Sequence, residues 1–121
     1  MSSYTKELFA AKDIAKEAGV IMRKYFDEDQ HIEIKKDNTQ VTIADKLINS
    51  LVIQRLAKAF PSDGVIGEEE STAEYGGGRK WFCDPIDGTA AYIWGVPTAM
   101  FSLGLVLDGR PVIPSAHYLQ N

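Results

Sequence analysis

The sequence predicts an α+β fold in which two long helices pack on a mainly antiparallel β-sheet. Apolar residues recur at helical spacing over residues 4–25 and again over residues 42–60. Short β-prone runs then fill the chain from residue 65 onward. Helices followed by a set of strands form layers, with the helices on one face of the sheet. The 121 residues, 45% of them hydrophobic, are enough for one core and too few for two.

The first predicted helix covers residues 4–25 and is amphipathic. Lys and Glu side chains lie opposite its apolar positions, as in a helix that packs on a core. These apolar positions are Tyr4, Leu8, Ala11, Ile14, Ala15, Ala18, Ile21, Met22 and Tyr25. Acidic residues interrupt the pattern at 27–29. Residues 31–35 then alternate like a short strand, and residues 36–40 are a predicted polar loop.

The second predicted helix begins after Thr42 and ends before Pro61. Asp45 follows Thr42 by three residues, which resembles a capping box with Asp in place of the usual Glu or Gln. Pro61 disfavours continuation of the helix. Its apolar positions are Ala44, Leu47, Ile48, Leu51, Leu56, Ala59 and Phe60. Because these lie on or near one face, the second helix also faces the core.

The second half of the chain supplies the strands of the sheet. The predicted strands are residues 65–67, 80–83, 99–107 and 110–117. The nearly unbroken apolar run at 99–107 indicates a strand buried on both faces, and Asp108-Gly109 predicts a hairpin turn. Pro111 and Pro114 indicate that the returning strand is an edge strand, is bulged or lacks a partner, because proline cannot donate to a sheet.

Acidic residues are concentrated between Asp63 and Asp87. This segment holds seven acids and two bases, whereas the remaining residues hold ten acids and eleven bases. Such a segment would repel nucleic acid and attract a cation, although a solvated acidic loop has the same composition. The apolar stretches are shorter than the ~20 residues of a membrane helix, and the single cysteine, Cys83, fits a reducing compartment. We therefore expect a cytoplasmic protein that binds neither nucleic acid nor a membrane.

Residues 84–89, with the sequence DPIDGT, are a candidate site for both metal and phosphate. Asp84 and Asp87 stand three residues apart, and a kinked loop with this spacing can bring both carboxylates onto one hard cation. Gly88 permits a tight turn and the close approach of a ligand. Thr89 offers a hydroxyl group and, if a helix begins there, backbone N–H groups suited to phosphate.

Three adjacent acids, Glu68, Glu69 and Glu70, follow the β-prone residues 65–67. They repel one another unless a positive charge shares the site. A divalent cation would relieve this repulsion, and full exposure of the loop to solvent is the alternative. Oxygen ligands without a histidine or thiolate cluster favour Mg²⁺ or Mn²⁺ over Zn²⁺, and ligand type alone leaves Ca²⁺ open. Mg²⁺ is the expected cofactor, with Mn²⁺ as a substitute.

Three segments resemble the inositol monophosphatase family of magnesium-dependent, lithium-sensitive phosphatases. They are NTQVTIAD at 38–45, GEEES at 67–71 and WFCDPIDGT at 81–89, in the order found in that family. The resemblance implies the N-terminal part of the layered fold shared with fructose bisphosphatases. Since members of the family are much longer, residues 1–121 would be the N-terminal metal-binding portion of a phosphatase domain. The absent C-terminal half would supply a further metal-binding aspartate.

The resemblance also implies a set of metal ligands. Glu68, Asp84 and Asp87 would bind metal through their side chains, and Ile86 would bind it through its backbone carbonyl. Glu69 would lie next to these ligands without binding the metal itself.

A second group of implied residues acts on the substrate and the attacking water. Asp45 and Thr89 would orient and activate the water, with Glu68 as an alternative base. Asp87, Gly88 and Thr89 would bind the substrate, the last two through backbone N–H groups that face its phosphate. Asp45 has a simpler explanation as well, because an acid in the first turn of a helix favours the helix dipole.

The implied reaction is Mg²⁺-dependent hydrolysis of a small phosphorylated metabolite by in-line attack of water, whose pKa the cation lowers. Residues 90–97 differ from the pattern of inositol-specific members, so histidinol phosphate, a bisphosphate nucleotide and fructose bisphosphate are alternative substrates. A non-catalytic metal-binding or assembly module is an alternative of another class. Without the further aspartate, the chain alone is expected to show little activity. The resemblance also implies a full-length homodimer, inhibition by Li⁺, and a metal-site lysine at either Lys35 or Lys36.

Overall fold

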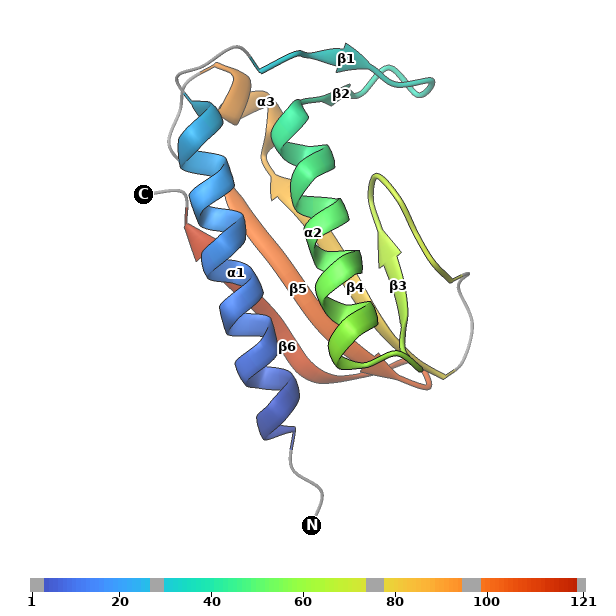
Figure 1. The fold of residues 1–121 in the computed structure, drawn as a ribbon. Helices are drawn as coiled ribbons and strands as arrows, with labels where there is room; N and C mark the ends of the chain where they lie inside the picture. Colours follow the sequence, from blue (N-terminus) through green and yellow to red (C-terminus); the bar gives the residue numbers. More distant parts are fainter. Residues whose placement is uncertain (1–3, 27–29, 74–77, 95–98, 120–121) are drawn as a thin grey trace.

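The computed structural model describes residues 4–26, 30–73, 78–94 and 99–119. Two long helices lie side by side across a β-sheet (Figure 1), which confirms the α+β fold predicted from the sequence. In chain order the elements are α1 (Thr5–Phe26), β1 (Glu33–Ile34), β2 (Gln40–Val41), α2 (Ile43–Ala59), β3 (Gly64–Gly67), β4 (Arg79–Asp87), α3 (Thr89–Ile93), β5 (Met100–Leu107) and β6 (Arg110–Leu119).

The main sheet has the strand order β3-β4-β5-β6. Strand β3 runs parallel to β4, whereas β4 with β5 and β5 with β6 are antiparallel. Gly67 at the end of β3 pairs with Cys83, and therefore the residues after β3 begin beside Asp84 of β4. The segment predicted as a strand and a polar loop is a separate hairpin of β1 and β2.

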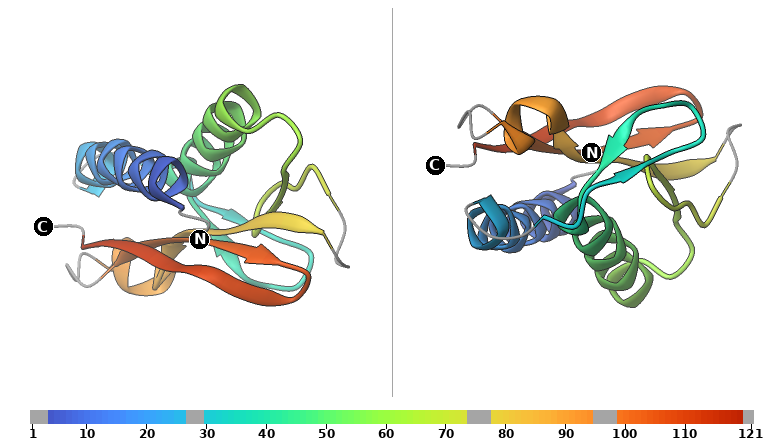
Figure 2. Two further views of the ribbon diagram at one scale, coloured as in Figure 1. Left: turned by 90° about the horizontal axis from the view of Figure 1, so that it is seen from below. Right: turned by 90° about the horizontal axis from the view of Figure 1, so that it is seen from above.

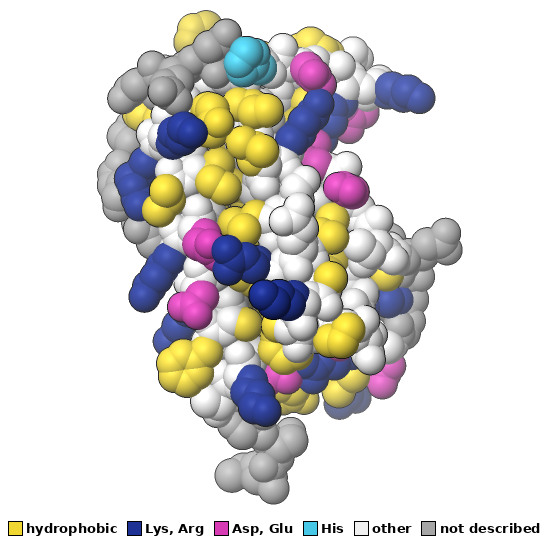
Figure 3. All heavy atoms as spheres, in the orientation of Figure 1, with side chains coloured by type: hydrophobic (Ala, Val, Ile, Leu, Met, Phe, Trp, Pro, Cys, Tyr) yellow, Lys and Arg dark blue, Asp and Glu magenta, His cyan; other side chains and the backbone are white. Residues whose placement is uncertain are grey.

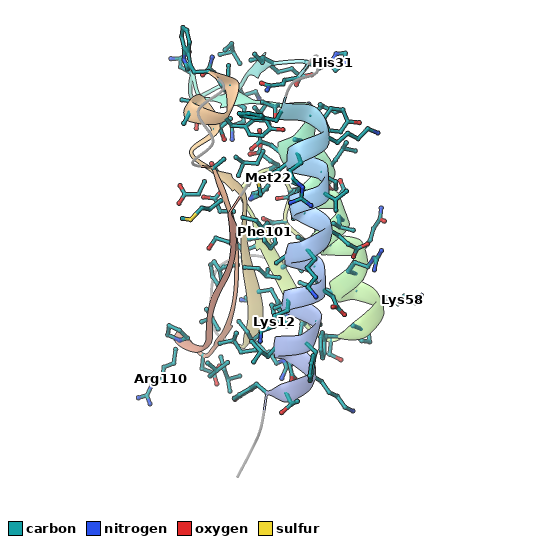
Figure 4. All side chains as sticks on the ribbon, turned by 90° about the vertical axis from the view of Figure 1, so that its left-hand side faces the viewer. Lys12, Met22, His31, Lys58, Phe101 and Arg110 are labelled. Atoms are coloured by element: carbon teal, nitrogen blue, oxygen red, sulfur yellow. The ribbon has the colours of Figure 1, made fainter. Side chains whose placement is uncertain are left out.

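Helices α1 and α2 cover the same face of the main sheet (Figure 2). Met22 of α1 and Phe101 of β5 lie between the helix and the sheet (Figure 4), and both are fully buried. Cys83 also packs in this core. The apolar face predicted for the first helix is confirmed at Ala11, Ile14, Ala15, Ala18 and Met22, which are buried. Leu8 departs from that prediction, because its side chain is 42% exposed.

The two faces of the sheet differ in burial along strand β5. Leu103 and Leu105 face the helices and are buried, whereas Ser102 and Val106 are half-buried. Gly104, which lies between these two residues on the same face, is buried, so the predicted burial of the strand on both faces is met only in part within the described residues, where α1 and α2 cover one face. Strand β6 is at the edge of the sheet, and its register shifts next to Pro111, as the prolines predicted.

A charged cluster joins α1 to the two parallel strands, at the opposite end of β4 from Asp84. The Arg79 guanidinium donates from Nη2 to Glu7 Oε2 at 2.7 Å and from Nε to Asp63 Oδ2 at 2.9 Å. The Trp81 indole N–H donates to the same Asp63 oxygen at 2.9 Å. Because Glu7 lies in the first turn of α1, this cluster fixes the start of that helix against the sheet.

The outer face of α1 and α2 carries apolar, basic and acidic side chains that are interspersed rather than segregated (Figure 3). None of the helices in the described residues is long and apolar enough to span a bilayer.

Candidate metal and phosphate site

Asp84 and Asp87 are brought together by a bulge in strand β4. Asp84 pairs with Ser102 of β5 and Asp87 pairs with Met100, so that one strand advances three residues while the other advances two. Residues three apart in a regular strand point to opposite faces, and the extra residue of a bulge reverses this relation. The sequence predicted a kinked loop here; the structure corrects this to a bulged strand, with Ile86 buried inside it.

Both aspartates line a cavity of about 390 Å³ next to the end of the sheet. The cavity is lined by Asn38, Thr39, Gln40, Glu68, Asp84, Ile86, Asp87, Gly88, Thr89 and Ala90. It thus collects all four of the predicted metal ligands and both of the predicted phosphate-binding residues. Glu68 and Asp87 are exposed at this cavity, and Asp84 is half-buried.

Glu68 reaches the cavity because of the parallel pairing of β3 and β4. Its backbone N–H donates to the carbonyl of Cys83 at 3.2 Å, which places Glu68 beside Asp84. Burial, hydrogen bonding to Glu68 and the negative charges of Glu68 and Asp87 raise the pKa of Asp84 to about 7. A carboxyl group with such a pKa holds a proton near neutrality, and a cation would take the place of that proton.

One oxygen of this carboxyl group has no partner. Asp84 Oδ1 is buried and makes no hydrogen bond within the described ranges. A buried carboxylate oxygen without a partner is costly, and its neighbours in the cavity are themselves oxygen donors that suit a hard divalent cation. No three acidic, imidazole or thiol side chains of the described residues converge closely enough to surround an ion. The oxygen donors that line the cavity are thus of the chemical type that Mg²⁺ prefers. Their carboxylates would have to move closer together to surround the ion.

Asp45 uses one of its two carboxylate oxygens, Oδ2, to cap helix α2. It is the third residue of α2, and its Oδ2 accepts from the Thr42 backbone N–H at 2.7 Å and from the Thr42 hydroxyl at 2.8 Å. The Thr42 side chain in turn accepts from the Asp45 N–H, which completes the predicted capping box. Burial raises the pKa of Asp45 more than the hydrogen bonds from Thr42 and Thr89 lower it.

Thr89 connects Asp45 to the bulged strand. The Thr89 hydroxyl lies 3.2 Å from Asp45 Oδ1 and 3.1 Å from the carbonyl oxygen of Ile86. A hydroxyl group has one hydrogen to donate, so these two acceptors compete for it. While Thr89 donates to Asp45, its oxygen keeps lone pairs that can accept a hydrogen bond from water in the cavity.

A turn at Gly88 directs the Thr89 side chain toward Asp45. Gly88 has φ +93°, in the left-handed region that favours glycine, and Thr89 is the first residue of α3. A helix thus begins at Thr89, which is the condition under which its backbone N–H groups would suit phosphate. Tyr92 anchors this short helix, because its hydroxyl donates to the carbonyl of Met22 at 2.7 Å.

Glu69 points away from the cavity and toward the β1–β2 hairpin. The Lys35 ammonium donates to its carboxylate at 3.2 Å, and the Glu69 side chain is 11% exposed whereas that of Lys35 is 28% exposed. Burial raises the pKa of Glu69 more than Lys35 lowers it, and the same pairing raises the pKa of Lys35 against the effect of burial. Lys35 is thus the lysine that reaches the acidic loop, whereas Lys36 is exposed.

The sequence interpretation missed two contributions to this region. The hairpin lends residues 38–40 to the cavity wall, although these were predicted as a plain polar loop. Asn49, which is 1% exposed, contacts the backbone of the acidic loop. The sequence did contain a signal for Asn49. It is a polar residue one helical turn after Asp45, on the otherwise apolar face of the second helix.

Comparisons of the sequence and of the fold with known proteins point to one family. The sequence pattern of the inositol monophosphatase family matches residues 3–117. Histidinol-phosphatase of Chlorobaculum parvum is 38% identical over 106 residues, which cover 87% of this chain and 41% of that protein. Inositol monophosphatase 1 of Solanum lycopersicum is 37% identical over 110 residues, with 88% of this chain and 40% of that protein covered.

A solved structure shows the same fold. The Thermotoga maritima IMPase superposes with a TM-score of 0.78 at 26% identity, covering 88% of this chain and 41% of that one. The chain therefore spans less than half the length of the relatives that it matches. With the family pattern present over nearly all of its residues, the chain belongs to the inositol monophosphatase family.

Proposed function

We propose that this chain provides the metal-binding and phosphate-binding part of a Mg²⁺-dependent phosphomonoesterase. The observation that carries the proposal is Asp84 Oδ1, which is buried without a partner among the described residues, in a cavity that Glu68 and Asp87 share. Three acids that face one cavity repel one another, and a divalent cation relieves both the repulsion and the unpaired oxygen.

In this proposal, Glu68, Asp84 and Asp87 hold Mg²⁺ through their carboxylates, with the Ile86 carbonyl as a fourth oxygen donor. When bound, Mg²⁺ supplies Lewis acidity and lowers the pKa of water. Asp87 and the start of α3, at Gly88 and Thr89, would receive the phosphate of the substrate. The cavity has the size of a small-molecule site, in keeping with a small phosphorylated metabolite.

The residues on the opposite wall would move the proton of the attacking water. Thr89 Oγ1 accepts a hydrogen bond from that water while it donates its own hydrogen to Asp45 Oδ1, and the proton then passes along this pair. Burial raises the pKa of Asp45 above its ordinary value, which makes its carboxylate a stronger base and supports its role as the proton acceptor. Glu68 is the alternative acceptor of that proton.

The substrate is proposed as a class rather than as a compound. The relatives include a histidinol-phosphatase and an inositol monophosphatase at nearly the same identity, and both names describe hydrolysis of a small phosphomonoester. Release of inorganic phosphate from inositol phosphate, histidinol phosphate and adenosine bisphosphate, measured side by side, would rank these substrates.

The metal role is tested by changing one ligand in the protein that carries this chain. Asp87→Asn keeps the shape of the side chain and removes its charge, so we expect Mn²⁺ affinity and phosphate release both to fall by at least about tenfold. Asp13→Asn is a matched control, because Asp13 is an exposed acid on α1. Equal Mn²⁺ affinity in Asp87→Asn and in the unmodified protein would refute the assigned metal site.

A metal-binding or assembly module without turnover remains the second candidate. Such a module would bind Mn²⁺ and release no phosphate from any of the three substrates, which separates it from the enzyme.

A further inference from the structure

Asn49 is a buried polar residue of α2 that the proposed reaction does not use. Its side chain is 1% exposed, and it lies one helical turn after Asp45, on the same core-facing side of the helix. From there its amide reaches the acidic loop that follows β3. Asn49 Nδ2 donates to the carbonyl of Glu70 at 2.9 Å, and Asn49 Oδ1 accepts from the N–H of Glu69 at 3.3 Å.

The fit between this amide and the loop is tight. A Cβ atom added to Gly67 would lie 2.4 Å from Asn49 Oδ1 and 2.3 Å from the carbonyl oxygen of Glu70. Either distance is far below van der Waals contact, so residue 67 has room for glycine and for nothing larger. The loop is also closed internally, since Ser71 Oγ accepts from the Gly67 N–H at 3.0 Å.

The two hydrogen bonds to Asn49 fix the backbone immediately after Glu68. On the other side, the Glu68 N–H is held by the carbonyl of Cys83. The Glu69 side chain is turned away from the metal cavity, toward Lys35. The loop is thus arranged so that Glu68 lines the cavity with Asp84, while Glu69 lines a different cavity together with Lys35 and Asn49.

We infer that Asn49 is a positioning residue that directs the Glu68 carboxylate into the metal cavity. Three successive acids would otherwise spread apart into solvent, because their charges repel. Asn49 opposes this by binding two backbone groups of the loop without adding charge. Groups that orient the ligands of a metal tune its affinity although they do not touch it. The inference rests on the proposed metal role of Glu68.

Two substitutions at Asn49 separate positioning from charge. Asn49→Ala removes both hydrogen bonds to the loop. Asn49→Asp keeps the shape and the acceptor for Glu69 N–H, but it sets an oxygen against the carbonyl of Glu70. By charge alone Asn49→Asp would strengthen the binding of a cation. If positioning dominates, both variants bind Mn²⁺ at least about tenfold more weakly than the unmodified chain.

Hydrogen exchange of the metal-free chain tests the contact itself. We expect the Glu69 amide to exchange at least about tenfold faster in Asn49→Ala than in the unmodified chain, because its buried acceptor is gone. In Asn49→Asp this amide should keep most of its protection. Val52→Ala is the matched control, since Val52 is fully buried on the same helix; it should lower stability and leave Mn²⁺ affinity within about twofold.

Three experimental results would contradict the inference, and each overturns a different step of it. If Asn49→Asp binds Mn²⁺ as tightly as the unmodified chain, or more tightly, the positioning role is overturned while the metal site stands. An unchanged Glu69 exchange rate in Asn49→Ala overturns the contact on which the role depends. If the unmodified chain itself binds no Mn²⁺, the proposed function fails, and the inference that rests on it fails with it.

Discussion

The hydroxyl oxygen of Thr89 lies 3.2 Å from Asp45 Oδ1, so the first residue of α3 contacts the first turn of α2. The other oxygen of the same carboxylate accepts two hydrogen bonds from Thr42. One side chain therefore caps a helix and faces the candidate site at once. Its rigid attachment to Thr42 holds Oδ1 at a fixed place opposite Thr89.

Removing the Thr89 hydroxyl tests the proposed proton path. Thr89→Val keeps the shape of the side chain, so we expect stability to change little. Phosphate release by the protein that carries this chain should fall by about 100-fold or more, in the range attributed to general acid–base catalysis. A rate close to that of the unmodified protein would exclude Thr89 from proton transfer.

The cap can be weakened without removing Asp45. Thr42→Ala deletes the hydroxyl that accepts from the Asp45 N–H and donates to Asp45 Oδ2. We expect the free energy of unfolding to fall by about 1 kcal/mol, as for other N-cap residues, measured by urea denaturation. Thr39→Ala is the control, because Thr39 is an exposed hairpin residue. Equal stability of the two variants would argue against the capping box.

The metal-free chain should lose stability as the pH rises from about 4 to about 7. Burial and the neighbouring acids raise the pKa of Asp84 from an ordinary 3.8 to about 7. A group with a higher pKa in the folded state binds its proton more tightly there. Its contribution is therefore complete below its ordinary pKa and is lost as the pH passes upward through about 7. Burial also raises the pKa of Asp45 and of Glu69, in the same direction.

Thermal unfolding at about pH 5 and about pH 8 measures this effect, and the lower pH should give the higher Tm. Asp84→Asn should reduce the difference, because an amide does not titrate in this range. Saturating Mg²⁺ should raise Tm most at the higher pH, where the carboxylates are ionised and free to bind it. A Tm in the metal-free chain that increases with pH would contradict the prediction.

The Arg79 cluster should contribute to stability rather than to chemistry. Arg79 donates to Glu7 on α1 and to Asp63 before β3, and the hydrogen bond from Arg79 is the main reason that the pKa of Glu7 is lowered. Arg79→Met leaves two carboxylates without their donor, and we expect a loss of about 2 kcal/mol in the free energy of unfolding. Mn²⁺ affinity should remain unchanged, since Arg79 lies at the opposite end of β4.

Gly88 should resist substitution for a conformational reason. Its φ is +93°, and the nearest atom to an added Cβ is the Ala99 Cα at 4.0 Å. Space is therefore available, but the backbone conformation costs about 1–2 kcal/mol for an L-residue. We expect Gly88→Ala to lose this amount in thermal unfolding and Gly88→Asn to lose less, because Asn enters this region more readily. Similar losses in both variants would point to a steric cause instead.

Local sequence determined the helices, the hairpin turn and the chemical type of the site. The helical spacing of apolar residues, the Thr42–Asp45 cap and the stop at Pro61 act within a few residues of each other, so their outcome can be predicted from the chain itself. The sequence DPIDGT is equally local. It identified Asp84, Asp87, Gly88 and Thr89 as oxygen donors and turn residues before their arrangement was known.

Tertiary structure alone decided how these residues meet. Glu68 lies beside Asp84 because β3 pairs in parallel with β4 in a register that sets Gly67 against Cys83. Asp84 and Asp87 share a cavity because β4 contains one extra residue opposite β5. Neither relation can be derived from local propensity, since strand register depends on the packing of distant segments. The same holds for Asn49, whose function depends on a loop about twenty residues away along the chain.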